Sequence, residues 1–170
     1  MKFILTLIMS LVLLGCVDVP EGIKPVTRFK INRYLGTWYE IARLDYMGEQ
    51  DLKSVSTEYS RNQKGDLVFK HRGYMTKWAE WREKEGRISL AGDPNVGHLK
   101  ISYFFPIYKP YVIFELDPDY QYAYVCGKDR SFLWLLSRAK YLDEDIVDDF
   151  IEKAQNLGFD TSKLVFTDQQ

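Results

Sequence analysis

Short segments in which apolar and polar residues alternate run through most of the chain, between residues 38 and 138. A period of two is typical of β-strands with one buried face. Clusters of Gly, Pro, Asn and Asp separate the segments and supply the backbone conformations that tight turns require. The pattern predicts eight strands, at residues 38–44, 54–61, 67–75, 87–91, 98–105, 111–116, 123–126 and 132–138.

The pattern becomes helical after the last of these strands. Apolar residues recur at helical spacing between an N-cap candidate, Asp143, and a C-terminal stop, Gly158. We expect this helix to pack its apolar face on the sheet, because its polar face is acidic and poorly suited to an anionic membrane surface. Residues 164–166 are a candidate final short strand.

No crossover helix lies between the predicted strands, which argues against a parallel sheet. The predicted fold class is therefore all-β: an eight-stranded up-and-down antiparallel β-barrel with one C-terminal α-helix packed on the barrel.

The amino terminus resembles a bacterial lipoprotein signal. Lys2 precedes an apolar run over residues 3–14, which is shorter than the roughly 20 residues that a transmembrane helix needs. The run ends in Leu-Leu-Gly before Cys16, which resembles a lipobox and implies cleavage and lipidation at Cys16. Val17, rather than Asp, follows the cysteine, and the sorting rule of such lipoproteins then implies the outer membrane, on its periplasmic face.

These features divide the chain into three parts. Residues 1–15 are the expected signal peptide, and residues 16–30, with Pro20, Gly22 and Pro25, are the expected lipidated tether. Residues 31–170 then form one domain, in agreement with a total length of 170 residues.

Composition narrows the function. A net charge of −1 without a basic run argues against nucleic-acid binding. The two histidines, His71 and His98, stand apart and match no metal-ligand spacing, so neither a metal nor another cofactor is expected. Cys126 is the only candidate nucleophilic cysteine in the expected domain, but its place in a predicted strand favours a small buried thiol, and we expect no enzymatic activity.

Three motifs carry a family resemblance. Gly36-Thr37-Trp38-Tyr39-Glu40-Ile41-Ala42 resembles the signature that opens the first strand of lipocalins. Residues 116–127 resemble their second signature, and residues 133–138 their third. The resemblance extends from about residue 34 to residue 166 and includes lipid-anchored bacterial members of the family.

The resemblance assigns structural roles to three residues. It implies that Trp38 closes the floor of the barrel and that Arg138 lies across it from the final strand. A cation–π contact between them would contribute about 1–2 kcal/mol if desolvated. Gly36 would give the chain room to pass this pair.

The residues alone predict only an apolar small ligand inside the barrel. The resemblance implies a fatty acid or lysophospholipid, bound for storage or transport in membrane maintenance under stress. Strand alternation lets only about half of our candidate lining residues face inward together. The candidates are Tyr59, Phe69, His71, Tyr74, Trp78, Tyr103, Phe105, Tyr111 and Phe114.

Three alternatives stay open. One is a retinoid or haem-type ligand, for which an inward His71 would be the only obvious axial ligand on these strands. The barrel interior could be filled by side chains, which would make the protein an envelope interaction protein without a lipid ligand. The aromatic segment 103–108 could line the open end or form an exposed lip that faces a membrane or a partner, including a second copy in a homodimer.

Overall fold

The computed structural model describes residues 19–45 and 51–169. The predicted signal peptide and Cys16 lie outside this part of the chain. Its elements, in chain order, are α1 (Ile31–Tyr34), β1 (Gly36–Leu44), β2 (Leu52–Arg61), β3 (Leu67–Met75), η1 (Thr76–Trp78), β4 (Glu80–Leu90), β5 (His98–Phe104), β6 (Ile107–Leu116), β7 (Tyr122–Cys126), β8 (Leu133–Ser137), α2 (Glu144–Asn156), η2 (Thr161–Lys163) and β9 (Leu164–Phe166).

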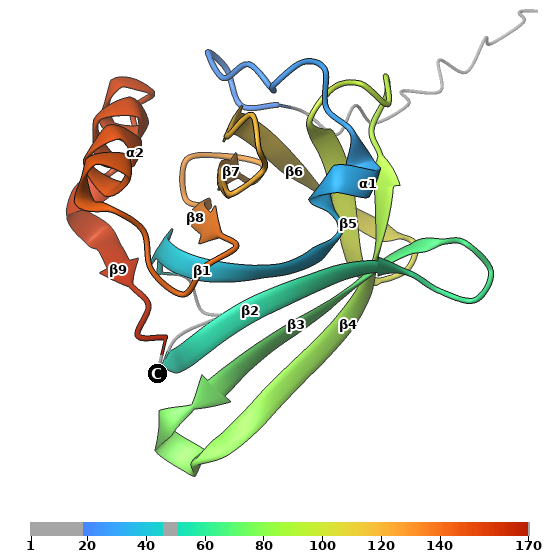
Figure 1. Ribbon diagram of the computed structural model, residues 1–170, viewed down its shortest axis with the longest axis horizontal. Coiled ribbons are helices and arrows are strands. Elements are labelled where there is room, and N and C mark those ends of the chain that lie inside the picture. The colour runs from blue at the N-terminus through green and yellow to red at the C-terminus, as the bar shows by residue number, and fades with distance from the viewer. Residues whose placement is uncertain (1–18, 46–50, 170) are drawn as a thin grey trace, which may run out of the picture.

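The sheet closes on itself into the predicted eight-stranded barrel (Figure 1). Each strand from β2 to β7 pairs antiparallel with the next, and β1 closes the ring by pairing with both β8 and β2. The predicted fold class is confirmed. Of the two α-helices in the described stretches, neither has the length and apolar run needed to cross a bilayer.

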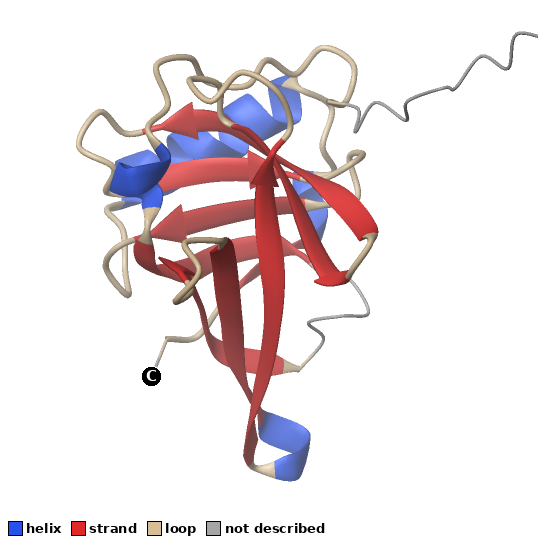
Figure 2. Ribbon diagram, turned by 90° about the vertical axis from the view of Figure 1, so that its right-hand side faces the viewer, coloured by secondary structure: helices blue, strands red, loops and turns tan. Residues whose placement is uncertain are grey.

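Strand β4 departs from its predicted extent, because it begins at Glu80 and not at residue 87. Its first residues pair with β3 beyond the end of β5, so that the β3–β4 hairpin projects from the barrel with η1 at its tip (Figure 2). The side chains from Glu80 to Glu85 are exposed on both faces of the hairpin. A strand without a buried face has no apolar alternation, which explains why the pattern missed it.

Helix α2 covers the outer wall of the barrel, as predicted (Figure 1). Its buried residues Phe150 and Ala154 pack in one apolar cluster with Tyr124 and Leu135 of β7 and β8. Asp143 occupies the N-cap position, although its side chain makes no capping hydrogen bond, and Gly158 ends the helix with φ +84°. The short strand β9 follows and pairs with β1.

Residues 19–30 differ from the expected tether, because they pack on the barrel. Ile23 and Phe29 are buried, and the amide of Val26 donates a 2.9 Å hydrogen bond to the carbonyl of Ile113. Phe29 belongs to the apolar cluster inside the barrel that includes Tyr34 and Trp38. The ordered domain therefore begins earlier than the predicted residue 31.

Candidate functional site

The barrel encloses a cavity of about 120 Å³. Its walls are mainly aromatic and aliphatic, and they come from six strands and the β7–β8 turn. The lining residues are Trp38, Glu40, Thr57, Tyr59, Phe69, His71, Ile101, Tyr103, Lys109, Pro110, Tyr111, Gly127, Lys128, Phe132, Trp134 and Leu136.

Five of the nine predicted lining residues meet in this cavity: Tyr59, Phe69, His71, Tyr103 and Tyr111. They come from β2, β3, β5 and β6, and four of them are aromatic. The alternation rule, which allows about half of the candidates to face inward, agrees with this outcome.

The other four candidates lie outside the cavity. Trp78 is exposed in η1, and Phe105 is exposed in the β5–β6 turn. Tyr74 packs against Trp81 on the outer face of the β3–β4 hairpin, with 5.5 Å between ring centroids. Phe114 lies three positions after the inward Tyr111 and therefore faces outward, where it stacks on Phe159 near α2.

Sequence reasoning missed several lining residues, of which Glu40, Ile101 and Trp134 are informative. The alternation contained a signal for two of them. Since Trp38 faces inward, Glu40 two residues later should also face inward, and the same holds for Ile101 beside Tyr103.

A network of aromatic side chains closes the floor of the cavity. The hydroxyl of Tyr111 lies 2.7 Å from that of Tyr34 and 2.8 Å from that of Tyr59, and the Tyr34 ring stacks on Trp38 at 4.7 Å. Trp38 Nε1 donates to the carbonyl of Tyr34. Burial raises the pKa of both Tyr34 and Tyr111 above the usual tyrosine value, so these hydroxyls remain neutral.

Below this floor, Arg138 makes the contact expected from sequence. Its guanidinium carbon lies 4.0 Å from the Trp38 ring centroid. The same group donates hydrogen bonds to four backbone carbonyls, those of Arg33, Leu35, Thr37 and Tyr120. Gly36 has φ +97°, and a Cβ there would lie 3.2 Å from Arg138 Nη1, so a side chain would be disfavoured by both conformation and space.

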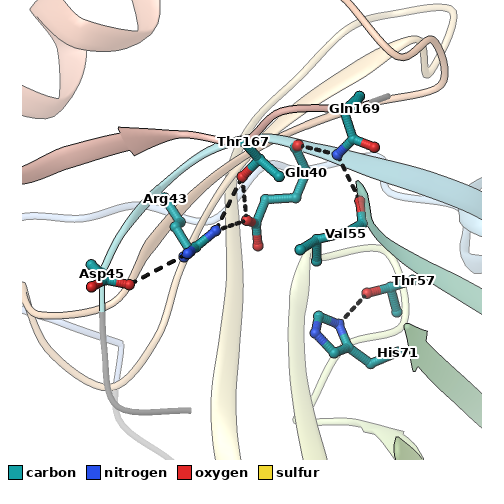
Figure 3. Close-up of polar contacts among 8 residues, drawn as sticks. All are labelled: Glu40, Arg43, Asp45, Val55, Thr57, His71, Thr167 and Gln169. Carbon is teal, nitrogen blue, oxygen red and sulfur yellow. Dashed lines mark hydrogen bonds and ion pairs between the residues drawn. The ribbon is translucent and has the colours of Figure 1, made fainter. Parts of the chain in front are cut away.

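One wall of the barrel is polar and forms a seam between β1 and β2 (Figure 3). Glu40 and Arg43 make a buried 2.7 Å ion pair, and the hydroxyl of Thr167 donates to the same carboxylate oxygen at 2.6 Å. The Gln169 side-chain amide donates to the carbonyls of Glu40 and Val55 and so bridges the two strands. The C-terminal residues thus complete the barrel wall where the two strands separate.

His71 lies on the cavity side of this wall. Its Nδ1 is 2.9 Å from the hydroxyl of Thr57. Burial lowers the pKa of His71, the charge of Glu40 opposes this, and the nearby Lys84 and Arg43 reinforce it. The imidazole is therefore neutral at neutral pH, and this part of the cavity gains no positive charge from it.

The geometry suits the binding of an apolar molecule. Cys126 is buried among the apolar residues beneath α2, away from the cavity, and burial raises the pKa of its thiol to about 12. Within residues 19–45 and 51–169, no three His, Cys, Asp or Glu side chains gather closely enough to hold a metal ion.

Comparison with known proteins agrees with this geometry. A family model described as a lipocalin-like domain matches residues 29–169. The chain is 43% identical to outer membrane lipoprotein Blc of Vibrio cholerae, over 100% of both chains. It is 39% identical to outer membrane lipoprotein Blc of Escherichia coli K12, over 88% of this chain and 85% of that protein.

Among solved structures, insecticyanin of the tobacco hornworm Manduca sexta superimposes with a TM-score of 0.71. The match covers 89% of this chain and 86% of insecticyanin at 20% identity, and it supports the fold alone. None of these matches names a catalytic family.

Proposed function

Because the chain belongs to the lipocalin family, we propose that it is an outer-membrane-anchored lipocalin that binds fatty acids or lysophospholipids in its barrel. Storage or transport of such lipids would serve membrane maintenance under stress. The ligand-binding residues proposed are the cavity-lining Tyr59, Phe69, His71, Tyr103 and Tyr111.

The observation that carries the proposal is the cavity itself. Its aromatic floor is closed and neutral, and its walls present mainly carbon. A dry apolar cavity of about 150 Å³ admits a benzene ring, so a space of this order suits one narrow acyl chain and not two side by side. Each methylene transferred from water would contribute about 0.8 kcal/mol.

The anchor is proposed from the lipobox at Cys16. Both bacterial relatives described above carry the name outer membrane lipoprotein, and the one from Vibrio cholerae aligns with the whole chain, including this segment. Three acyl chains on the processed amino terminus would exceed the two signals that stable membrane anchoring requires.

Native mass spectrometry tests the ligand. The protein would be residues 16–170 with Cys16→Ser, because residues 19–169 hold the whole barrel and both apolar clusters. Oleate, lysophosphatidylethanolamine and diacyl phosphatidylethanolamine would be offered separately. We expect one single-chain lipid per barrel and little binding of the diacyl lipid.

A matched pair of tryptophan substitutions locates the site. Ile101→Trp adds bulk inside the cavity and should weaken lipid binding at least about tenfold, since it removes room for several methylenes. Val68→Trp adds the same side chain on the opposite face of the sheet, beside the inward Phe69, and should leave binding unchanged. A folded wild-type barrel that takes up no lipid would instead favour the filled-barrel interaction protein.

A further inference from the structure

The exposed apolar side chains gather on two hairpin tips. Eight large apolar residues are exposed in the part of the chain that the structure describes, and five of them lie on these tips. Trp78 and Trp81 are at the tip of the β3–β4 hairpin, and Phe104, Phe105 and Ile107 are at the β5–β6 turn. Phe104 is 80% exposed and Ile107 68%. An apolar group of this kind on a surface indicates an interaction site.

The same two hairpins are basic. The β3–β4 hairpin (67–90) and the β5–β6 hairpin (98–116) together carry eight Lys and Arg against four Asp and Glu, a net charge of +4 in a chain of net charge −1. In the outer part of the β3–β4 hairpin, residues 76–85, three cations balance three carboxylates, so the unbalanced cations Arg87, Lys100 and Lys109 lie beside the β5–β6 tip.

Four of the cations lie over aromatic rings at or beside the tips. Arg72 is 3.8 Å from the Trp81 ring centroid and Lys77 is 5.2 Å from that of Trp78. Arg87 is 5.1 Å from the Phe105 ring centroid, and Lys100 is 5.3 Å from that of Tyr108 in β6. Aromatic rings flanked by long basic side chains are typical of surfaces that sit at a membrane interface.

Both tips lie at the open end of the barrel. In an antiparallel meander the turns after β3, β5 and β7 share one end, and Lys128 and Phe132 of the β7–β8 turn line the cavity there. The floor made by Trp38 and Arg138 is at the opposite end.

The first described residues lie at the same end, beside the β7–β8 turn. Arg130, in the β7–β8 turn, donates a 2.7 Å hydrogen bond from Nη2 to the carbonyl of Glu21. Glu21 is five residues after Cys16, a distance that an extended chain spans in at most about 18 Å. A membrane that holds Cys16 is therefore within reach of the open end.

We propose that the tips of the β3–β4 and β5–β6 hairpins dock on an anionic lipid bilayer and turn the mouth of the barrel toward it. A single-chain lipid then passes between the membrane and the cavity without crossing bulk water. This use of the docking surface rests on the proposed carrier function, whereas docking itself does not. A second copy of the chain is a poorer occupant, because a two-fold contact through the β5–β6 tips would bring Arg87, Lys100 and Lys109 of one copy against the same cations of the other.

Vesicle co-sedimentation of residues 16–170 with Cys16→Ser tests the docking, since this form has no lipid anchor. We expect binding to vesicles of phosphatidylcholine with phosphatidylglycerol, and weaker binding to phosphatidylcholine alone. Lys100→Glu should lower the first by about tenfold or more. Tryptophan fluorescence should be quenched by brominated lipid, because Trp78 and Trp81 are exposed at one tip.

A matched pair of double variants identifies the surface. Phe104→Ser with Ile107→Ser should lower the partition coefficient by about a hundredfold, since two apolar side chains leave the interface. Tyr141→Ser with Phe166→Ser removes two exposed apolar residues elsewhere, 77% and 55% exposed, and should leave it unchanged. Circular dichroism verifies that both variants are folded.

Three results would overturn the proposal: no binding to phosphatidylglycerol vesicles, equal losses in the two double variants, or a stable dimer that buries Phe104 and Ile107. Uptake of a micellar single-chain lipid, followed by native mass spectrometry in the same variants, reports on the cavity separately. A protein that loads lipid but does not dock would retain the carrier function and lose only this inference.

Discussion

Replacement of Arg138 tests whether the floor of the barrel is closed by its guanidinium. Arg138→Met keeps the apolar stem of the side chain and removes the charge and all the donors. The lost interactions are the cation–π contact with Trp38 and the bonds to four carbonyls. Two of these bonds, to Leu35 and Tyr120, are partly buried, whereas the other two are exposed.

The magnitude follows from this division. The cation–π contact, between a buried ring and a partly exposed guanidinium, contributes about 1 kcal/mol. Each partly buried carbonyl that loses its donor costs about 1 kcal/mol, whereas water replaces the donor at the exposed ones. We therefore expect Arg138→Met to lower the free energy of unfolding by about 3 kcal/mol, and the melting temperature by about 6–12 °C for a domain of this size.

Urea denaturation followed by tryptophan fluorescence measures the change, with Tm as a second readout. Arg138→Lys keeps a charge near the ring but lacks the planar fork that reaches several carbonyls, so it should recover less than half of the loss. Arg130→Met is the control, because Arg130 also donates to two backbone carbonyls but lies over no aromatic ring of residues 19–45 and 51–169. A loss below about 1 kcal/mol for Arg138→Met, or full recovery with lysine, would refute the reasoning.

Three further predictions concern the barrel wall. Cys126, whose thiol pKa burial raises to about 12, should react with a thiol reagent at pH 8 only after unfolding, and rapid labelling of the folded protein would contradict this. The pKa of His71 is lowered in the folded state, so the unfolded state binds its proton first and the free energy of unfolding should fall as the pH decreases from about 6.5. His71→Gln should flatten that dependence in urea titrations, and an unchanged slope would assign it to other groups. Gly86→Ala should cost about 1–3 kcal/mol by the same assay, because its Cβ would overlap the Phe69 ring and lie 2.5 Å from the carbonyl of Ser102; a stabilised variant would show that the ring moves freely.

The barrel was predictable from the sequence because most of its strands bury one face, and a strand with one buried face shows alternating apolar and polar residues. The helix was predictable for the same reason, from the spacing of its apolar face between Asp143 and Gly158. The projecting part of β4 was not, since its exposed faces impose no pattern. Residues 19–30 also escaped prediction, because Phe29 docks through contacts with Tyr34 and Tyr120 that leave no local periodicity.

The cavity lining was only partly predictable, because a lining residue must both lie on the inner face of its strand and stand at the level of the cavity along the barrel axis. Alternation distinguishes the inward-facing Tyr111 from the outward-facing Phe114. It cannot predict that Phe105 lies in the turn between β5 and β6, outside the cavity. Glu40 could have been found by counting two residues from Trp38. A carboxylate in a wall that was otherwise predicted to be apolar is explained only by its ion-pair and hydrogen-bond partners.

Those partners come from the far end of the chain, and they limit how Glu40 can be used. Backbone pairing between β1 and β2 extends only from Gly36 to Tyr39, so the wall beyond it needs other donors. The Gln169 side-chain amide supplies two such hydrogen bonds, to the carbonyls of Glu40 and Val55. Thr167 and Arg43 both donate to one carboxylate oxygen of Glu40. The buried ion pair between Glu40 and Arg43 is costly to disturb, because replacing one of the two residues would leave the charge of the other buried without this partner. Glu40 therefore belongs first to the closure of the barrel, and in the proposed lipid carrier discrimination among lipids would fall to the aromatic wall and to Lys109 and Lys128 at the mouth.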